Sequence, residues 1–336
     1  MKKTKIAING FGRIGRAAFR IIEEREDCEV VAINDLTDNA TLAHLLQYDT
    51  VFRKYPKIVS SNEKYLIVDE EKYPVFANPD PAQLPWAEKE VDIVLECTGF
   101  FVKDGAAYKH LDAGAKRVVI SAPAKGEGDV ETYVLGVQEP RRESTHVISN
   151  ASCTTNCISP VMKVMCDEFG VEKSLMTTIH SYTSTQKLQD GPAKDLRKAR
   201  AAAQNIIPTT TGAAIATTKV IPELVDRFDG MAMRVPTIDA SIADITVVTK
   251  RDVTEEEVNN ALISASAGEL KGILGVTDEP LVSSDFIGEC RSSVVDLSLT
   301  KVIGGNLVKV IAWYDNEWGY ANRLVDMAVR YGKIFQ

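Results

Sequence analysis

The sequence predicts an α/β protein of two domains, the first with an open parallel sheet and the second an α+β domain with a larger, mostly antiparallel sheet. At 336 residues the chain exceeds the usual size of one domain. Short apolar strand patterns alternate with helical patterns up to residue 150, as they do around a parallel sheet. After Cys153 the strand patterns become longer and rich in Val, Ile and Thr, which marks the start of the second domain.

The first domain opens with a βαβ unit. Residues 5–10 and 29–35 are short apolar runs typical of buried strands, and residues 15–26 between them have helical periodicity. Further strand patterns lie at 91–99, 115–123 and 145–150, with a helical pattern at 104–114.

The second domain is expected to contain fewer but longer elements. Its strand-like runs are 174–183, 231–250 and 307–320, its internal helix is 254–270, and a closing helix covers 320–332. Residues 181–212 form the most irregular stretch of the chain, and a loop of that length is usually functional.

Composition limits the classes of function. The formal net charge of −8 argues against a nucleic-acid-binding protein, because binding to phosphates needs a basic face. No run approaches 18 apolar residues and the N-terminus lacks an apolar segment of signal length, so we expect a cytoplasmic protein with no membrane role. Six scattered cysteines are expected to be reduced thiols.

Three glycines follow the first strand with the spacing of a dinucleotide-binding turn. Gly10, Gly12 and Gly15 form G-x-G-x-x-G at the start of the first helix, where the positive end of the helix can hold a pyrophosphate. Asp35 ends the next strand, where a carboxylate can accept both ribose hydroxyls. Because Asp35 would repel the extra phosphate of NADP and no arginine stands beside it, we expect NAD as the cofactor.

The segment "SNASCTTNC" raises the question of whether Cys153 is a nucleophile or a packing residue. Cys153 begins a predicted helix, whose dipole favours a thiolate, and His180 is a candidate partner that could share its proton. The apolar neighbours of Cys157 and Cys166 favour packing roles for those two thiols. Cys153 and Cys157 have poor spacing for zinc, so we expect no metal site.

A reactive thiol beside NAD favours aldehyde oxidation. The thiolate adds to the aldehyde, hydride leaves to the nicotinamide, His180 removes the hydroxyl proton, and a thioester remains on Cys153.

The chain resembles the phosphorylating glyceraldehyde-3-phosphate dehydrogenase family over essentially its whole length. The segments "INGFGRIGR", "SNASCTTNC", "HSYT", "DLRKAR", "IIPTTTGAA", "MAMRVPT" and "WYDNEWGY" occur in the family's order and at its spacing. The resemblance implies a Rossmann NAD-binding domain at 1–152, completed by the C-terminal helix at 317–336. It also implies a catalytic domain at 153–316 and a homotetramer in the cytoplasm.

The resemblance also implies the roles of individual residues. Cys153 would be the nucleophile and His180 the base in the oxidation of glyceraldehyde 3-phosphate with NAD and inorganic phosphate. The implied residues of the two anion sites, one for the substrate phosphate and one for inorganic phosphate, are Ser152, Cys153, Thr154, Thr183, Arg197, Thr211, Gly212 and Arg234. The implied cofactor contacts are Gly10, Gly12, Arg13, Ile14, Gly15, Asp35, Thr98, Gly99, Ser121, Asn316 and Tyr320, with Pro192 contributed by a neighbouring subunit.

Three features depart from the family pattern. Pro79 stands where the family usually carries a cation, Ile215 replaces a common lysine, and the segment "YDTVFRKYP" lacks a glycine often found there.

Three other functions remain alternatives. The first alternative is erythrose-4-phosphate dehydrogenase, which releases a free acid through water and lacks the threonines and glycine of "HSYT" and "TTTGAA". The others are a non-catalytic NAD-binding protein and a cysteine hydrolase, which would not need NAD.

Overall fold

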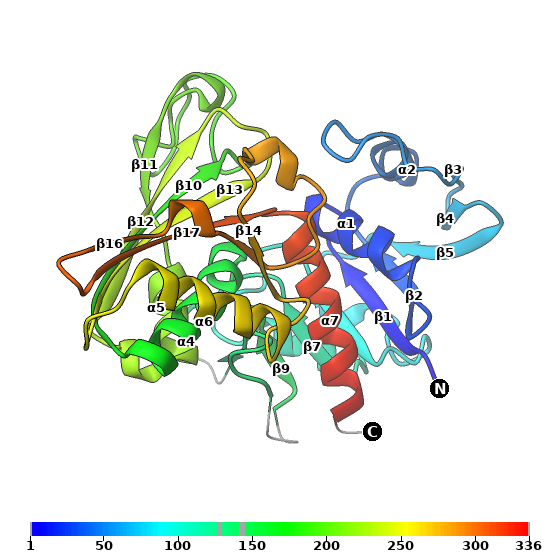
Figure 1. Cartoon of the computed structure of the whole chain (residues 1–336). Coiled ribbons are helices and arrows are strands. Elements are labelled where there is room, and N and C mark those ends of the chain that lie inside the picture. Colours follow the sequence, from blue (N-terminus) through cyan, green and yellow to red (C-terminus); the bar gives the residue numbers. More distant parts are fainter. Residues whose placement is uncertain (1, 127–129, 141–144, 335–336) are drawn as a thin grey trace. The chain divides into compact units, whose positions relative to one another are not determined.

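The chain divides into two compact units in the computed structural model, which describes residues 2–126, 130–140 and 145–334 (Figure 1). Unit 1 comprises residues 1–133, 140–151 and 321–336, and unit 2 comprises residues 134–139 and 152–320.

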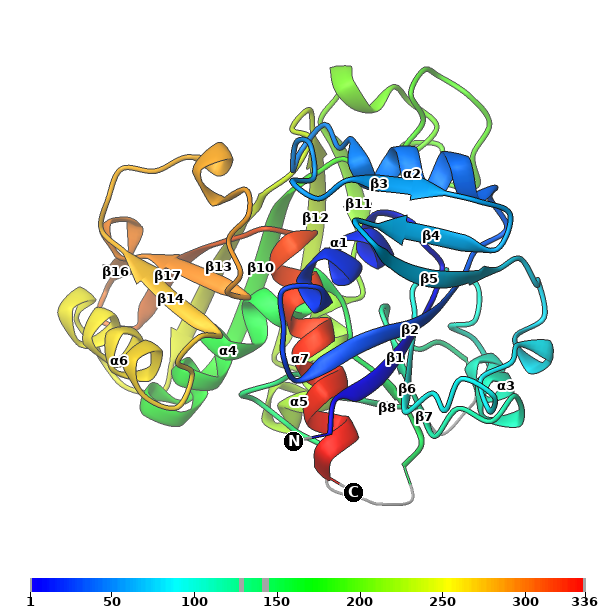
Figure 2. The same cartoon turned by 90° about the vertical axis from the view of Figure 1, so that its right-hand side faces the viewer.

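Unit 1 is built on a nine-stranded sheet with the order β3-β4-β5-β2-β1-β6-β7-β9-β8 (Figure 2). The predicted parallel sheet is confirmed, since β5, β2, β1, β6, β7, β9 and β8 all pair in parallel, and β3 and β4 add an antiparallel edge. The strands are β1 (Thr4–Asn9), β2 (Cys28–Asn34), β3 (Val59–Ser61), β4 (Tyr65–Val68), β5 (Glu71–Phe76), β6 (Ile93–Glu96), β7 (Arg117–Ile120), β8 (Glu131–Thr132) and β9 (Val147–Ser149).

The order of the strands reverses between β1 and β6. From β1 the chain builds outward to β2 and β5 on one side, and it then returns to add β6, β7 and β9 on the other. In open α/β sheets the crevice at such a reversal, at the carboxyl ends of the strands, is where ligands bind. The described helices of unit 1 are α1 (Arg13–Ile22), α2 (Asn39–Gln47), α3 (Lys109–Asp112) and the greater part of α7 (Trp318–Ile334), with 3₁₀ turns at Pro81–Gln83 and Ala106–Tyr108.

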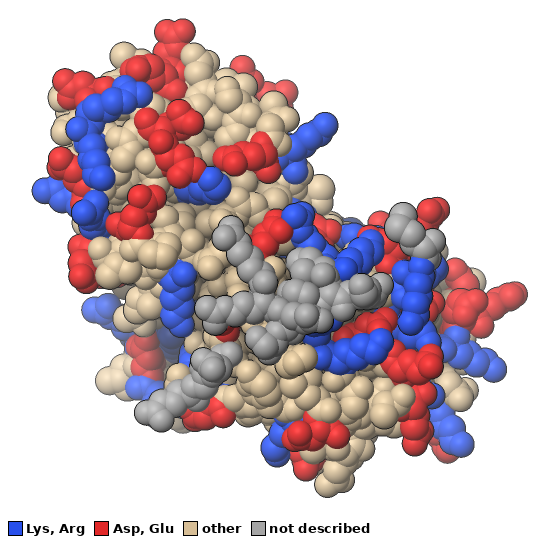
Figure 3. Space-filling model, turned by 90° about the horizontal axis from the view of Figure 1, so that it is seen from below, with Lys and Arg blue, Asp and Glu red and all other residues tan. Residues whose placement is uncertain are grey.

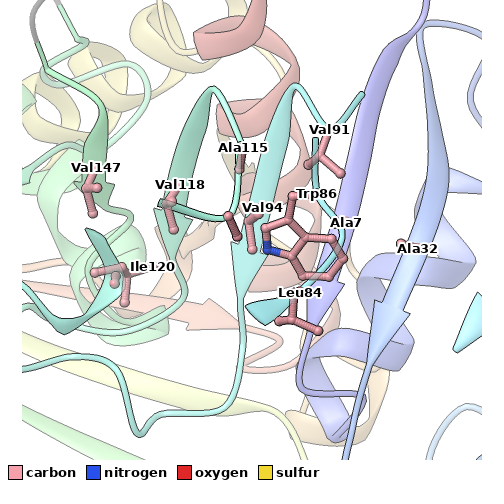
Figure 4. Close-up of a cluster of buried hydrophobic side chains, with 12 residues drawn as sticks. Ala7, Ala32, Leu84, Trp86, Val91, Val94, Ala115, Val118, Ile120 and Val147 are labelled. Atoms are coloured by element: carbon pink, nitrogen blue, oxygen red, sulfur yellow. The ribbon is translucent and has the colours of Figure 1, made fainter. Parts of the chain in front are cut away.

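A buried apolar cluster anchors this sheet from one side (Figure 4). Trp86 is fully buried and lies with Val94, Val118 and Ile120 from β6 and β7. The closing helix α7 belongs to the same unit through its residues from Ala321 onward, and its Tyr331 ring lies under the Arg117 guanidinium at 5.2 Å.

Unit 2 contains an eight-stranded sheet whose main path is β11-β12-β10-β13-β17-β15-β14, with β16 paired to β17. The predicted mostly antiparallel character is confirmed, with β10–β12 and β14–β15 as the parallel pairs. The strands are β10 (Val171–Ser181), β11 (Ile207–Thr210), β12 (Phe228–Val235), β13 (Ser241–Thr249), β14 (Leu274–Thr277), β15 (Ser293–Asp296), β16 (Lys301–Ile303) and β17 (Leu307–Tyr314).

Two expectations for unit 2 need correction. The run 231–250 is two strands rather than one, because the chain leaves β12 after Val235 and turns through Ala240, which has a positive φ of 62°, before β13 begins. The stretch 181–212 is not loop throughout, since it contains a 3₁₀ turn at Ala202–Gln204 and the edge strand β11. Further 3₁₀ turns lie at Pro222–Leu224, Ser283–Phe286 and Leu297–Leu299.

Helices α4 (Cys153–Phe169), α5 (Ala213–Val220) and α6 (Glu255–Ala267) pack on one face of this sheet (Figure 1). Alternate residues of β10 therefore differ in burial, with Thr178 and His180 buried on the helical face and Leu175 exposed on the other. A predicted helix is confirmed in α6, whose start is fixed by a capping box between Thr254 and Glu257.

The charges are mixed on the surface in view in Figure 3, where Lys and Arg are interspersed with Asp and Glu. Within the described part of the chain, no helix is both long enough and apolar enough to cross a membrane.

Candidate active site

Cys153 occupies the first helical position of α4 in unit 2. The Ser152 hydroxyl caps the helix by accepting a hydrogen bond from the Thr155 amide at 3.1 Å. Just before the cap, Ala151 has a positive φ of 55°. The thiol is half-buried, so the chain places it at a helix N-terminus that still has a side open to a ligand.

The structure brings Cys153, His180 and Arg234 together. The Cys153 Sγ lies 3.5 Å from His180 Nε2. The other ring nitrogen, Nδ1, lies 2.7 Å from the Ser181 carbonyl oxygen and 2.7 Å from Arg234 Nη1. His180 and Arg234 are direct partners across the parallel pair β10–β12, which explains why both side chains reach the same place.

Burial favours the neutral forms of the thiol and the imidazole. Burial raises the pKa of the Cys153 thiol against the lowering effects of the Arg234 cation and of hydrogen bonds from Thr154. Burial and then the charge of Arg234 lower the pKa of His180 to about 3. Both effects work against the expected thiolate–imidazolium ion pair, while the Arg234 cation and the Thr154 hydrogen bonds favour the thiolate. A neutral imidazole beside a neutral thiol is suited to accept the thiol proton as an electrophile arrives.

Tyr314 is a part of this site that the sequence argument missed. It is buried at the end of β17, and its hydroxyl lies 3.0 Å from Thr154 Oγ1 and 2.8 Å from Thr178 Oγ1. Its ring meets the His180 ring edge-on at 6.0 Å. Tyr314 therefore fixes the start of α4 and the imidazole relative to β10, and the apolar strand pattern around it gave no signal of that role.

The side-chain amide oxygen of Asn316 already accepts hydrogen bonds from other residues of unit 2. Its Oδ1 accepts hydrogen bonds from the hydroxyls of Ser181 at 2.7 Å and Ser241 at 2.6 Å. This assigns the oxygen and leaves the Nδ2 group to donate to a ligand acceptor, as the expected contact with a nicotinamide amide requires.

The expected anion residues fall at two places along the sheet of unit 2. Arg234 lies beside His180, while Thr211 and Gly212 lie between β11 and the N-terminus of α5. Ile207 pairs with Arg234 and Thr210 pairs with Met231 across β11–β12, so the last residue of β11 lies about 10 Å from Arg234 along the strand direction.

The long loop carries Thr183, Pro192 and Arg197. Thr183 is tied to Gln186 through its backbone amide at 2.8 Å. Pro192 and Arg197 are exposed, and the Arg197 guanidinium has no carboxylate partner among the described residues. The structure by itself does not bring Pro192 or Arg197 to Cys153.

Arg234 is also without a carboxylate partner within the described ranges, and its buried Nε atom has no hydrogen-bond acceptor there. A buried guanidinium that lacks a counter-charge is costly. It is therefore a fitting partner for an anionic ligand.

In unit 1 the glycine motif has the geometry that dinucleotide binding requires. Gly10 has a φ of +94°, and a Cβ there would lie 2.8 Å from the Thr98 amide nitrogen. At Gly15 a Cβ would lie 2.1 Å from the Gly10 carbonyl oxygen, so the helix can approach the strand only with glycine. Gly12 has nothing within 4 Å of the equivalent position, and no side chain caps α1, so its first amides are available to a phosphate.

Asp35 and Arg13 lie beside this turn, with Ile14 next to Arg13 in the first turn of α1. The Asp35 carboxylate accepts hydrogen bonds from the Phe11 amide at 2.7 Å and the Thr37 amide at 2.9 Å, so it also holds the glycine turn in place. The Arg13 side chain pairs with Asp49 at 2.5 Å. Any contact of Arg13 with a cofactor phosphate is therefore best made by its backbone amide.

A buried polar network that the sequence argument missed supports Thr98 and Gly99 at the end of β6. The Glu96 carboxylate accepts from the Thr98 amide at 2.8 Å, from Asn9 Nδ2 at 2.5 Å and from His110 Nε2 at 3.1 Å. The Trp86 indole donates to His110 Nδ1 at 2.9 Å, which leaves Nε2 as the protonated nitrogen. Apolar strand patterns conceal such a network because its polar members come from four separate elements.

The last two expected cofactor contacts, Ser121 and Tyr320, each lie at the end of a regular element. Ser121 follows β7 with its amide bonded to the Glu96 carbonyl oxygen, and Tyr320 is buried in the first turn of α7.

Cys157 and Cys166 are buried, while Cys290 is exposed and is thus a second accessible thiol. Among the described residues no group of three or more His, Cys, Asp or Glu side chains could hold a metal ion.

The chain combines a dinucleotide-binding sheet with a unit that places a cysteine thiol 3.5 Å from an imidazole. This combination is typical of one class, the NAD-dependent oxidoreductases that work through a covalent thiol intermediate. Family models place the chain within this class. The model of the glyceraldehyde 3-phosphate dehydrogenase NAD binding domain matches residues 4–104, and the model of the C-terminal domain matches residues 152–316. The chain belongs to the glyceraldehyde 3-phosphate dehydrogenase family.

Curated relatives match over almost the whole chain. A glyceraldehyde-3-phosphate dehydrogenase of Priestia megaterium is 54% identical over 326 residues, which cover 96% of this chain and 97% of that protein. That of Thermotoga maritima is 56% identical over 325 residues, with coverage of 96% and 97%. Glyceraldehyde-3-phosphate dehydrogenase 1 of Bacillus subtilis is 53% identical over 331 residues, with coverage of 98% of each chain.

Proposed function

We propose that this protein is a phosphorylating glyceraldehyde-3-phosphate dehydrogenase of glycolysis and gluconeogenesis. It oxidises D-glyceraldehyde 3-phosphate with NAD and inorganic phosphate to 1,3-bisphosphoglycerate through a thioester on Cys153. The observation that carries the proposal is the 3.5 Å approach of Cys153 Sγ to His180 Nε2, in a chain whose relatives are named glyceraldehyde-3-phosphate dehydrogenase.

Cys153 and His180 would perform the covalent steps. As the aldehyde arrives, the sulfur bonds to the carbonyl carbon while the thiol proton passes by way of His180 Nε2 to the carbonyl oxygen, giving a hemithioacetal and a neutral His180. Bound NAD supplies a hydride acceptor for its oxidation to the thioester. The neutral His180 then takes the proton from the hemithioacetal hydroxyl.

Inorganic phosphate resolves the thioester. A phosphate oxygen attacks the acyl carbon, the carbon–sulfur bond breaks, and the acyl phosphate leaves as Cys153 regains a proton. Two anion sites are required, and we assign them to two sets of residues in unit 2. Arg234, Thr183 and Arg197 form one set, and Ser152, Thr154, Thr211 and Gly212 form the other.

NAD is held by unit 1 in this proposal. The turn at Gly10, Gly12 and Gly15 and the amides of Arg13 and Ile14 take the pyrophosphate, and Asp35 takes the ribose hydroxyls. Thr98, Gly99 and Ser121 line the same edge of the sheet, while Asn316 donates to the nicotinamide amide and Tyr320 lies nearby in sequence. We assign residues 1–152 and 317–336 to the NAD-binding domain and residues 153–316 to the catalytic domain.

We also propose that the protein works as a homotetramer in the cytoplasm. The face of the unit 2 sheet opposite its helices exposes Leu175, Met231 and Leu307, at 67%, 37% and 38% of their surface. Leu175 and Leu307 line an open groove of about 950 Å³ on this face. A second copy of the chain would cover this surface, and a neighbouring subunit would bring Pro192 to the cofactor.

Phosphate dependence tests the assignment against erythrose-4-phosphate dehydrogenase. We expect NADH formation from glyceraldehyde 3-phosphate to require inorganic phosphate and to saturate with it. A turnover rate that does not depend on the phosphate concentration, or that is higher with erythrose 4-phosphate, would favour erythrose-4-phosphate dehydrogenase.

Variants of the anion-site residues test their roles in phosphate binding. Arg234→Leu should lower kcat/KM by at least about two orders of magnitude, with NAD affinity nearly intact, because a bound phosphate loses its buried cation. Thr183→Ala removes only a neutral donor and should cost less. Arg200→Leu removes an exposed arginine that is paired with Asp190 and serves as the matched control.

A further inference from the structure

One arm of the buried polar network in unit 1 crosses the neighbouring strands β5, β2, β1 and β6 at their carboxyl ends and runs in a fixed direction. It begins at the backbone amide of Asn78, which can only donate and which donates to Asn34 Oδ1 at 2.9 Å. Asn34 therefore turns its Nδ2 group to Asn9 Oδ1 at 2.7 Å. Asn9 in turn donates from its Nδ2 group to the Glu96 carboxylate at 2.5 Å.

The other arms of the network also end on Glu96. The Trp86 indole can only donate, and it donates to His110 Nδ1 at 2.9 Å. His110 therefore carries its proton on Nε2, which donates to the Glu96 carboxylate at 3.1 Å. The Thr98 amide donates to the same carboxylate at 2.8 Å, and the Thr98 hydroxyl donates to it as well. Four donors converge on this group, those of Thr98 on Oε1 and those of Asn9 and His110 on Oε2.

This arrangement assigns a negative charge to Glu96. A proton on either oxygen would displace one of the four donors, and a displaced Asn9 or His110 group would stay buried without a partner. His110 adds no positive charge, because its Nδ1 accepts from the indole. Glu96 is 1% exposed, and in the described ranges no Lys or Arg nitrogen lies within 4 Å of its carboxylate. Glu96 is therefore a buried charge that no cation balances.

A buried charge of this kind is costly, and a ligand of opposite charge would offset part of the cost. The strands β1, β2 and β5 form the half of the sheet that carries Asp35, and β6 begins the other half, which takes the second nucleotide in a dinucleotide-binding sheet. With Asp35 on the adenosine ribose, the second nucleotide is the one that contains nicotinamide. Its ring carries a positive charge in NAD⁺ and none in NADH.

We propose that Glu96 is a fixed negative charge by which unit 1 binds the oxidised cofactor more tightly than the reduced one. The pyrophosphate has the same charge in NAD⁺ and NADH, so its repulsion by Glu96 cancels in the comparison. The positive nicotinamide ring is attracted in NAD⁺ alone. After hydride transfer the ring is neutral, this attraction is lost, and NADH leaves more readily.

This inference rests on the proposed function only in the orientation of NAD on unit 1, so it is tested by binding without substrate. Calorimetric titrations give the Kd of NADH, of NAD⁺ and of ADP-ribose, which lacks the nicotinamide. The decisive quantity is the Kd of NADH divided by the Kd of NAD⁺. At an effective dielectric constant of about 20, unit charges about 20 Å apart still change an equilibrium constant about fourfold.

The variant Glu96→Gln removes the charge and keeps the size of the side chain. We expect the affinity for NAD⁺ to fall about tenfold and the affinities for NADH and ADP-ribose about threefold or less, so the ratio falls by about threefold or more. Glu96→Asp keeps the charge but shortens the side chain and weakens its hydrogen bonds. All three affinities should then fall alike, and the ratio should stay as in the unmodified protein.

A matched control lies at the other end of the same strand. Asp92 directly precedes β6, is 4% exposed and is paired with Lys116 at 2.6 Å. Asp92→Asn removes a carboxylate that a cation already balances, and it should leave the ratio unchanged.

A second variant neutralises the charge without changing Glu96. His110→Lys places a cation beside the carboxylate and should lower the ratio as Glu96→Gln does, and circular dichroism shows which of the two variants folds. An unchanged ratio in a folded variant of either kind, or an equal fall in Glu96→Asp, overturns the proposal. NADH formation from glyceraldehyde 3-phosphate, measured on the same samples, reports a failure of the proposed function separately.

Discussion

We expect the substitution Asp239→Asn to make the protein more stable at neutral pH. The residue follows β12, is 2% exposed, and neither carboxyl oxygen has a hydrogen-bond partner in the described chain. Burial, then the charges of Asp315 and Glu317, raise the pKa of Asp239 from 3.8 to about 9. The folded protein therefore keeps a proton on Asp239 at pH 7 that the unfolded chain releases.

The size of the effect follows from linkage. The folded-state pKa lies above the unfolded value, so stability is fully present below pH 3.8 and falls as the pH rises towards about 9. Each pH unit in that window costs 1.36 kcal/mol, so the loss between pH 3.8 and pH 7 is at most about 4 kcal/mol. Asp239→Asn keeps the shape of the side chain and removes the titration.

Thermal unfolding across pH measures this difference. We expect Asp239→Asn to raise Tm little at pH 5 and increasingly towards pH 8, by about 2 to 4 °C for each kcal/mol gained. Asp278→Asn removes an exposed carboxylate of the same unit and is the matched control. A Tm difference that does not change with pH, or a destabilised variant at pH 8, would refute the reasoning.

Three further predictions concern the two units. In a time course with limiting iodoacetamide, Cys153 should be modified before the buried Cys28, Cys157 and Cys166, whose pKa values burial raises to about 12. The exposed Cys290 is the competing target, and mass mapping that finds a buried thiol modified first would count against the site. Asp35→Ala should weaken NAD binding by about tenfold or more and raise the use of NADP relative to NAD, because hydrogen bonds to a charged group are lost and like-charge repulsion disappears. An unchanged cofactor ratio in steady-state assays would show that Asp35 does not face the ribose. Glu96→Gln should weaken NAD binding about tenfold in calorimetric titrations, since its amide would oppose the Thr98 and Asn9 donors, and full affinity would refute a supporting role.

Much of the fold could be predicted because its strands and helices are determined by patterns that are local in the sequence. Alternating apolar runs and helical periodicity predicted the parallel sheet of unit 1, and helical periodicity predicted α6. The run 231–250 failed as a single strand because the Val-, Ile- and Thr-rich composition on both sides outweighed the break signal of Pro236, which directly follows β12. The turn itself also depends on a positive φ at Ala240. Nothing in the sequence distinguishes Ala240 from any other alanine.

The candidate site could be predicted only where residue type implies chemistry. A cysteine at a helix start, a histidine and an arginine in an apolar strand were found in that way. Tyr314, Glu96 and His110 were not found, because their contacts join segments far apart in the sequence. The pKa shifts of Cys153 and His180 could not be predicted either, since burial is their first cause and the sequence does not show how deeply a side chain is buried.

The protonation of the buried Asp239 carboxyl group affects the Cys153 thiol. An ionised Asp239 raises the pKa of that thiol, opposite to the effect of the Arg234 cation. Burial raises the pKa of Asp239 to about 9, so the carboxyl group keeps its proton at pH 7 and this effect is absent. The energetic cost of burying Asp239 in its neutral form is therefore accompanied by a lower pKa of the Cys153 thiol than an ionised Asp239 would allow, and stability at neutral pH is exchanged for a more acidic nucleophile.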